Sequence, residues 1–331
     1  MKNLIFALNI ALFLIIPGYI TAEVHTIINP VAPDGHDPWV TQKGGVYYYC
    51  YSQKGGIWVN RSRTIQNAVQ FRGIEIWRPE PGTPYSKEIW APELHNIRDR
   101  WYVYFAADDG KNENHRMYVL ESDTGNALGK YTFMGKIADS SDKWAIDGTV
   151  LNFDGNLYFI WSGWEGEKNV QQNLYIARMK DPVSVKGNRV LLSQPDYDWE
   201  KIGNPLINEG PQVLHHHSDV FIIYSASGSW TDDYCLGQLR LTGTDPLNPE
   251  SWHKKMTPVF GSTATVFGPG HASFTKSPDG SEDWIVYHAA KFSGAGWNRN
   301  TRMQPFIWDI DGNPCFGYPV SEGVEIPIPS E

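Results

Sequence analysis

The hydrophobic residues of the chain gather in short runs separated by polar turn residues. After residue 23, almost no stretch has the sustained 3.6-residue hydrophobic period of an amphipathic helix. Aromatic and β-branched residues dominate the runs, and Gly, Asp and Asn stand between them, as hairpins require. The clearest runs are 45–49, 100–105, 156–161, 219–224 and 283–287. This pattern predicts an all-β fold.

A short polar motif precedes each of the five runs, and each motif contains one acid or histidine. These anchor residues are Asp37, Glu93, Asp147, Glu209 and His271, and they lie 54 to 62 residues apart. Units of this length, each with three or four strands, predict a five-bladed β-propeller. A β-sandwich or a solenoid is the alternative, but a sandwich gives no reason for polar anchors at near-equal spacing.

The N-terminal segment differs from the rest of the chain. Lys2 precedes an apolar run over 4–16, Pro17 and Gly18 break the run, and Ala22 follows, which is the layout of a secretory signal peptide. An N-terminal membrane anchor is the alternative, yet a bilayer span needs about 20 apolar residues. We therefore expect cleavage near Ala22, a secreted extracellular protein without membrane attachment, and a single propeller domain over 23–331.

Composition narrows the range of partners. The net charge of −9 argues against nucleic acid or an anionic membrane as the main partner. The 14 tryptophans, 17 tyrosines and 14 phenylalanines suit strands and also platforms for sugar rings. Cys50, Cys235 and Cys315 lie far apart and define no disulfide framework. We interpret them as small hydrophobic residues with at most one bridge.

Three of the anchor acids suggest chemistry. In a propeller the first strand of each blade lines the central channel, so Asp37, Asp147 and Glu209 would meet at one mouth. Like charges placed close together raise the pKa of at least one carboxyl, which can then act as a general acid. Cleavage of a glycosidic bond needs one protonated and one ionised carboxyl. Any single Asp before Pro or Gly is more simply a turn residue, but acids at similar places in four units weaken that interpretation.

The ordered set of motifs resembles glycoside hydrolase family 43 over nearly the whole mature chain. The matching segments are Asp37-Pro38, Trp90-Ala91-Pro92-Glu93, Ile146-Asp147-Gly148, Asn208-Glu209-Gly210-Pro211 and Gly268-Pro269-Gly270-His271. The resemblance implies an inverting hydrolase in which Asp37 is the general base and Glu209 the general acid. Asp147 would orient Glu209 and tune its pKa, and Glu93 would be structural or at the pocket edge. Inversion implies carboxyls roughly 6.5–9.5 Å apart.

The resemblance also implies roles for two basic residues. His271 would lie on the channel axis near a bound water or a structural calcium, although one histidine without an adjacent acid is poor calcium chemistry. The hydrolysis itself would require no cofactor. Arg302 would lie near Asp147 and the sugar hydroxyls, where its charge would lower the pKa of Asp147 and keep that residue ionised.

Further residues are candidates for binding the sugar. Trp90 would line the pocket, and Phe105 and Ser162 would face it from the ends of their strands. Trp164 and Trp297 would be sugar platforms on loops, and Trp39 could pack beneath Asp37. Core packing is an equally good interpretation of each tryptophan. The run His215-His216-His217 is interpreted as a turn or surface feature, because neighbouring residues on a strand alternate faces.

Segments 203–211 and 302–306 look most like the α-L-arabinofuranosidase branch of the family, including exo-acting enzymes on 1,5-linked arabinan. A monomer that releases L-arabinofuranose from arabinan or arabinoxylan side chains, in plant cell wall degradation, is therefore expected. A β-xylosidase or endo-arabinanase of the same family is the main alternative. A non-catalytic carbohydrate-binding propeller would not need all three acids. A retaining fructan-active enzyme would carry an Asn-Asp-Pro motif, whereas His36 precedes Asp37 here.

Overall fold

The computed structural model describes residues 25–330, so the predicted signal peptide lies outside the described residues. Strands account for nearly all of the regular structure, and α1 (Ile65–Gln70) is the one α-helix in this range. Three short 3-10 turns are present at η1 (Asn112–Asn114), η2 (Asp198–Glu200) and η3 (Pro249–Ser251). The prediction of an all-β fold is confirmed. Within 25–330, no helix has the length and apolar character needed to span a membrane.

The strands follow the chain in five runs of four, each joined by antiparallel pairing. Unit 1 contains β2 (Trp39–Lys43), β3 (Val46–Gln53), β4 (Gly56–Ser62) and β5 (Ile74–Trp77), and unit 2 contains β6 (Lys87–Ile97), β7 (Arg100–Asp108), β8 (Arg116–Ser122) and β9 (Tyr131–Lys136). Unit 3 contains β10 (Ala145–Phe153), β11 (Asn156–Trp164), β12 (Gln171–Asp181) and β13 (Ser184–Ser193). Unit 4 contains β14 (Leu206–His216), β15 (Asp219–Ala226), β16 (Cys235–Leu241) and β17 (Trp252–Lys254). Unit 5 contains β18 (Phe267–Lys276), β19 (Asp283–Ala290), β20 (Arg299–Trp308) and β21 (Pro314–Cys315).

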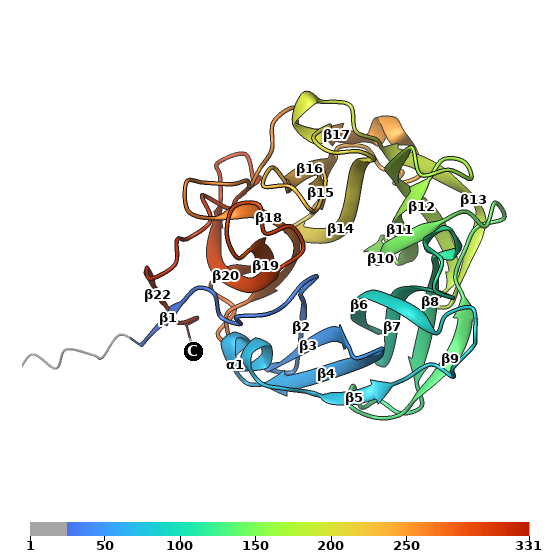
Figure 1. The fold of residues 1–331 in the computed structure, drawn as a ribbon, viewed down its shortest axis with the longest axis horizontal. Coiled ribbons are helices and arrows are strands. Elements are labelled where there is room, and N and C mark those ends of the chain that lie inside the picture. Colours follow the sequence, from blue (N-terminus) through green and yellow to red (C-terminus); the bar gives the residue numbers. More distant parts are fainter. Residues whose placement is uncertain (1–24, 331) are drawn as a thin grey trace, which may run out of the picture.

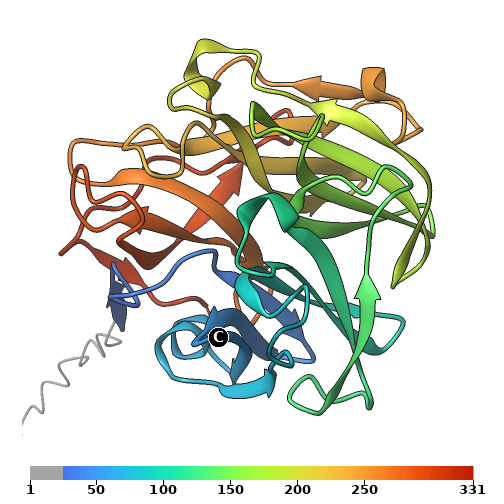
Figure 2. The same ribbon diagram turned by 45° about the vertical axis from the view of Figure 1, so that its right-hand side comes forward.

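Two kinds of contact connect the units. Units 3 and 4 merge into one eight-stranded sheet, because Gln171 and Gln172 of β12 pair in parallel with Leu206 and Ile207 of β14. The first strand of each unit contacts the first strand of the next, and β18 contacts β2. The units therefore follow one another around a common centre, as Figure 1 shows, and Figure 2 shows the same arrangement from a second direction. The terminal strands β1 (Thr26–Ile28) and β22 (Glu325–Pro327) pair with each other.

The hydrophobic core lies between the units. The buried apolar residues form five clusters, and each is contributed mainly by two neighbouring units. The cluster between units 1 and 2, for example, joins Val59 of β4 to Val103 of β7. Because burial of apolar area is the main stabilising contribution, each unit depends on its neighbours for stability. This explains why the aromatic runs recur with the repeat.

Phe105 belongs to this core, so its assignment to the sugar pocket is wrong. Its side chain is fully buried in the cluster between units 1 and 2. The ring lies 5.1 Å from Trp77 and 5.8 Å from Tyr118, measured between ring centroids. β7 is covered on both faces, so a residue near its end does not have to face solvent.

The cysteines and the histidine run match their simpler interpretations. Cys50, Cys235 and Cys315 form no disulfide, and the first two are buried. His217 has a positive φ of 52° at the turn between β14 and β15. The ring of His216 stacks on Trp308 at 3.9 Å between centroids. The run is a turn and surface feature.

Candidate active site

Asp37 lies just before β2 and is surrounded by four basic side chains. Its Oδ2 lies 3.0 Å from Nδ1 of His36, and its Oδ1 lies 3.3 Å from Nδ1 of His271. Nδ1 of His288 lies 3.4 Å from Oδ1 and accepts a 3.0 Å hydrogen bond from the Asp37 backbone N–H. Nη1 of Arg299 lies 3.8 Å from Oδ1. The carboxylate is held in a fixed orientation with positive or polar groups around it.

These neighbours decide the protonation state of Asp37. Burial raises the pKa of the carboxyl, but the adjacent imidazoles of His271 and His36 outweigh burial and hold the pKa well below its usual value. Burial in turn lowers the pKa of His271, and it lowers that of His288 to about 3, so His288 is neutral and can accept the Asp37 N–H. Asp37 is therefore an ionised carboxylate that can accept a proton.

The pKa of Glu209, on β14, is shifted in the opposite direction to that of Asp37. Its carboxyl is buried, and the hydroxyl of Tyr234 donates a 2.9 Å hydrogen bond to Oε1. Burial raises the pKa of Glu209 to about 7, although the Tyr234 hydrogen bond and the charge of Arg299 lower it in part. Asp37 adds to the rise. A carboxyl with this pKa can hold a proton near neutral pH and release it during a reaction.

Asp147 on β10 is tied to the backbone next to Glu209. Its Oδ2 accepts a 3.0 Å hydrogen bond from the N–H of Gly210. Burial raises the pKa of Asp147 well above its usual value, and the charges of Glu209 and Asp37 raise it further. The expectation that an arginine keeps Asp147 ionised is therefore wrong, because acids rather than bases are its charged neighbours.

The units share a strained backbone position close to these acids. In β6, β10, β14 and β18 the pairing register shifts beside the anchor motif. One residue there has a positive φ between 42° and 55° in every unit; these residues are Asp37, Ala91, Asp147, Gly210 and His271. Such backbone is unfavourable for residues other than glycine and is concentrated at functional sites. Three of the anchor residues occupy this positive-φ position themselves. In unit 4 the position is Gly210, and Glu209 lies one residue before it; in unit 2 it is Ala91, and Glu93 lies two residues after it.

Arg299, rather than Arg302, is the arginine of this site. Nε of Arg302 donates to Oδ1 of Asn300 at 2.9 Å and its Nη1 donates to the carbonyl of Val320 at 3.2 Å. The prediction for Arg302 is therefore wrong. Successive residues of a strand point to opposite faces, so positions three apart on β20 do not share a face. The segment 299–302 contains both arginines, and the sequence alone does not show which of them approaches the acids.

Two other expected sugar contacts are interior residues. Ser162 is fully buried, and its hydroxyl donates a 2.9 Å hydrogen bond to the carbonyl of Asn208. Trp164 is buried and stacks on Trp144 at 4.8 Å between ring centroids. Both predictions as pocket residues are wrong, because these side chains pack inside unit 3 and against β14. Ser162 nevertheless supports the residue that precedes Glu209.

Trp90 and Trp297 are accessible to solvent, whereas Trp39 is engaged in contacts within the fold. Trp90 is half-buried and stacks on His115 at 4.0 Å between centroids. Trp297 is 68% exposed, and its Nε1 donates to the hydroxyl of Ser229. Trp39 contacts unit 2, since its Nε1 donates to the Leu94 carbonyl and its ring lies 4.6 Å from His95.

Tyr234 and His288 are site residues that the sequence did not indicate. Both are fully buried, and their rings stack at 5.7 Å between centroids with an interplanar angle of 14°. A Cβ atom on Gly270 would lie 2.3 Å from a ring carbon of Tyr234, so this glycine leaves room for the tyrosine. The glycine in the motif before His271 was the available signal.

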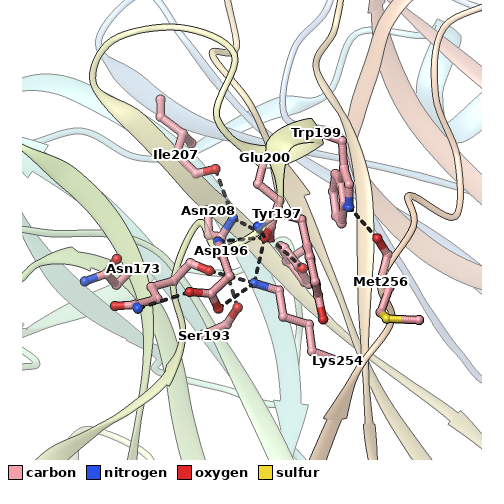
Figure 3. A network of polar contacts seen from close by, with 12 residues as sticks. Asn173, Ser193, Asp196, Tyr197, Trp199, Glu200, Ile207, Asn208, Lys254 and Met256 are labelled. Atoms are coloured by element: carbon pink, nitrogen blue, oxygen red, sulfur yellow. Dashed lines mark hydrogen bonds and ion pairs between the residues drawn. The ribbon is translucent and has the colours of Figure 1, made fainter.

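A buried polar network, shown in Figure 3, includes Asn208, the residue that precedes Glu209. Glu200 is fully buried and lies 2.8 Å from Nζ of Lys254. Its Oε1 accepts hydrogen bonds from Nδ2 of Asn208 at 3.1 Å and from the hydroxyl of Tyr224 at 2.9 Å. Because Asn208 directly precedes Glu209, this network holds the backbone that carries the carboxyl.

The donor atoms around His271 do not fit a calcium ion. Within residues 25–330 no group of three or more His, Cys, Asp or Glu side chains is arranged to hold a metal ion. Calcium prefers six to eight oxygen ligands, whereas His271 directs Nδ1 at Asp37 and its backbone N–H donates to the hydroxyl of Ser225.

Glu93 contacts His95 and Gln212 and is buried, as expected for a structural role.

Comparison with known proteins identifies the family of this chain. Residues 27–314 match the model of Glycosyl hydrolases family 43. An extracellular exo-alpha-(1->5)-L-arabinofuranosidase of Streptomyces avermitilis is 36% identical over 326 residues, covering 93% of this chain and 67% of that protein. Alpha-L-arabinofuranosidase 43 of Humicola insolens is 34% identical over 89% of this chain and 64% of its own length. The chain therefore spans about two thirds of the length of these curated relatives.

A solved structure gives the same result at the level of the fold. The α-L-arabinofuranosidase from Lactobacillus brevis superimposes with a TM-score of 0.84 and 36% identity, over 90% of this chain and 98% of that one. The family match extends over nearly all of the described residues and includes every residue of the site. The chain belongs to glycosyl hydrolase family 43.

Proposed function

We propose that this protein is an inverting α-L-arabinofuranosidase with Asp37 as general base and Glu209 as general acid. The observation that carries the proposal is the opposite pKa shifts of these two carboxyls in one buried site. Two titratable groups whose pKa values are driven apart by their surroundings are typical of an acid–base pair. The similarity to arabinofuranosidases at 34% to 36% identity supports the choice of sugar.

The reaction follows from the two protonation states. The ionised Asp37 takes a proton from a water molecule, whose oxygen attacks the anomeric carbon of the arabinofuranosyl unit. The bond from that carbon to the leaving oxygen breaks, and Glu209 donates its proton to this oxygen. Asp147 orients the acid, since it holds the N–H of Gly210 next to Glu209. The charge of Arg299 stabilises the ionised forms of Asp37 and Glu209.

The remaining features of the proposal concern the whole protein. Five units whose first strands form a closed ring support a five-bladed β-propeller that makes one catalytic domain over 23–331. The N-terminal sequence and the extracellular Streptomyces relative support secretion after cleavage near Ala22. The protein acts as a monomer on arabinan or on arabinoxylan side chains of plant cell walls.

A substrate panel tests the activity. Purified protein is incubated with nitrophenyl α-L-arabinofuranoside, nitrophenyl β-D-xyloside, linear arabinan and arabinoxylan, and product lengths are followed over time. We expect arabinose as the first product from arabinan. Xylose release would favour a β-xylosidase, and a ladder of oligosaccharides would favour an endo-arabinanase. The anomer formed first, observed by NMR, should be inverted, and retention would exclude this mechanism.

Two variants test the assigned roles. Asp37→Ala should lose nearly all hydrolysis on every substrate, and substantial activity in this variant would exclude Asp37 as the base. Glu209→Ala should recover activity on substrates with an activated leaving group, because these need little protonation. Equal loss on activated and natural substrates would show that Glu209 is not the acid. Circular dichroism should show that both variants are folded.

A further inference from the structure

The segment that leads to Asp37 is bound along the last unit of the fold. Residues 29–35, named here the docking segment, are hydrogen-bonded to β20, the strand that carries Arg299. Asn29 is fully buried, and its side-chain amide pairs with both backbone groups of Met303. Nδ2 donates to the Met303 carbonyl at 2.9 Å, and Oδ1 accepts the Met303 N–H at 3.0 Å. Because buried backbone groups need partners, the amide fixes the start of the segment on β20.

Backbone hydrogen bonds continue the attachment toward Asp37. The N–H of Ala32 donates to the carbonyl of Thr301 at 3.2 Å, and the N–H of Thr301 donates back to the carbonyl of Ala32 at 3.0 Å. The N–H of Gly35 then donates to the carbonyl of Arg299 at 3.3 Å. The three attachment points on β20 are alternate residues of the strand, so the segment follows one edge of it.

The same two strands of unit 5 hold Asp37 itself. Thr301 pairs with His288 of β19, and Nδ1 of His288 accepts the backbone N–H of Asp37 at 3.0 Å. The chain from Ala32 to Asp37 is therefore bound to unit 5 at both ends, with the Arg299 carbonyl holding its middle. The contacts of the Asp37 carboxylate with His288 and Arg299 depend on where this short piece of chain lies.

Gly35 allows the docking segment to approach β20 this closely. A Cβ atom on Gly35 would lie 2.1 Å from Oγ1 of Thr301 and 3.4 Å from its Cβ. The first distance is far inside van der Waals contact, and Thr301 is fully buried, so its side chain has little room to move. Any larger residue at position 35 would push the segment away from β20, two residues before Asp37.

We propose that the docking segment positions the general base, with Asn29 and Gly35 as its positioning residues. The attachment to β20 sets the Asp37 carboxylate at the place from which it takes a proton from the attacking water. Catalysis is sensitive to such placement, since a shift of about 1 Å can cost about a hundredfold in rate. This inference rests on the proposed role of Asp37 and adds what holds that residue in place.

A steric change and its suppressor test the contact. Gly35→Ala introduces the methyl group that meets Thr301, and Thr301→Ala removes the hydroxyl that it meets. The wild type, both single variants and the double variant form a double-mutant cycle. Gly166→Ala is the matched control, because a Cβ atom at this exposed glycine has no neighbour within 4 Å. For each protein, kcat and KM for nitrophenyl α-L-arabinofuranoside are measured between pH 4 and 10.

Gly35→Ala should lower kcat at least about tenfold and leave KM within about twofold, because the base and not the sugar contacts is displaced. Asp37 is faced by His36, His271, His288 and Arg299. Moved away from these groups while still buried, its carboxyl gains a higher pKa, so the acidic limb should rise by about one pH unit. In the Thr301→Ala background the same change should cost less than about twofold in kcat. Gly166→Ala should behave as the wild type.

Two results would overturn the proposal. One is an equal loss of kcat from Gly35→Ala with and without Thr301→Ala. The other is a loss of stability with kcat and the acidic limb unchanged, which would make the segment merely structural. If Gly35→Ala does not fold, Asn29→Ala provides the test, since it removes two hydrogen bonds without adding an atom. It should shift kcat and the acidic limb in the same directions, and unchanged values would equally overturn the proposal.

A measurement without substrate separates this inference from the proposed function. The pKa of Asp37 is read by NMR from the carboxyl carbon of ¹³C-labelled aspartate, assigned with Asp37→Asn. A higher pKa in Gly35→Ala, restored in the double variant, supports the docking segment even if the wild type cleaves no arabinofuranoside. That inactivity would contradict the proposed function alone. An active wild type whose Asp37 has the same pKa in all variants would contradict the docking segment alone.

Discussion

Tyr234 donates its phenolic hydrogen to Oε1 of Glu209 at 2.9 Å, and both side chains are buried. The tyrosine ring stacks on His288 and lies in space that Gly270 leaves open. A donor to the ionised form of a carboxyl lowers its pKa. The hydroxyl therefore opposes the effect of burial, which raises the pKa of Glu209 to about 7. In the proposed mechanism, Tyr234 is a positioning residue that influences the pH at which Glu209 releases its proton.

Replacing Tyr234 should move the pH profile without removing the catalytic carboxyls. In Tyr234→Phe the hydrogen bond is lost, so the pKa of Glu209 rises. The acid then stays protonated to higher pH, and the alkaline limb of kcat/KM should shift upward by about one pH unit, since a hydrogen bond to a charged group is worth roughly 1.5–3 kcal/mol. The measurement is kcat/KM for nitrophenyl α-L-arabinofuranoside between pH 4 and 10.

Tyr224→Phe is the matched control for that variant. Tyr224 is also fully buried in unit 4, and its hydroxyl donates to Glu200 at 2.9 Å rather than to Glu209. The control should lose stability but keep the wild-type alkaline limb. An equal shift in both variants would mean that the effect is a general loosening of the site.

The wild-type profile of activity against pH should be bell-shaped, with its acidic limb at low pH. Glu209 must be protonated to act, so activity falls as pH rises through its pKa of about 7. Asp37 must be ionised, and its pKa is held well below the usual value, so its limb lies at the acidic end. The two limbs report the coupled site as a whole. An alkaline limb two or more units above 7 would contradict the assignment of Glu209 as the acid.

Arg299 and Arg302 give a paired test of which arginine serves the site. Arg299→Met removes a positive charge near Asp37 and Glu209. We expect kcat/KM to fall at least about tenfold, with the alkaline limb displaced to higher pH because that charge lowers the pKa of Glu209. Steady-state kinetics across pH measure both effects.

Arg302→Met should behave differently. This side chain donates to Asn300 and to the Val320 carbonyl. Its loss should cost about 1–3 kcal/mol in the free energy of unfolding, because buried acceptors are left unsatisfied. The pH profile should keep its wild-type shape. A shift of the alkaline limb in Arg302→Met, with none in Arg299→Met, would reverse the assignment.

The buried network around Glu200, which includes Asn208 and Lys254, should contribute mainly to the free energy of unfolding. Glu200→Gln leaves Lys254 without its buried partner, and breaking a buried ion pair is strongly destabilising. We expect a loss of about 2–4 kcal/mol in the free energy of unfolding, measured by urea denaturation. Glu250→Gln, at an exposed position in η3, should change it by less than about 0.5 kcal/mol. Equal stability of the two variants would show that the network is not needed.

The local pattern of residues was sufficient to predict the strands and the acids. Each strand needs a buried face, so the aromatic runs that recur with the repeat directly report where strands lie. Asp37, Asp147 and Glu209 stand in ordered motifs, and the structure brings all three into one buried site. The strands and the motifs depend on residues close together in the sequence, which is why the sequence alone determined them.

The neighbours of the acids depended on tertiary structure. Tyr234 reaches Glu209 within unit 4, 25 residues away, and His288 and Arg299 of unit 5 reach Asp37 beside unit 1, up to 262 residues away. Phe105, Ser162 and Trp164 have the same residue types as pocket residues, but the packing of neighbouring units buries them. Burial and contacts across the centre also set the pKa of each acid. No local pattern records these contacts, because they exist only once the units close around their common centre.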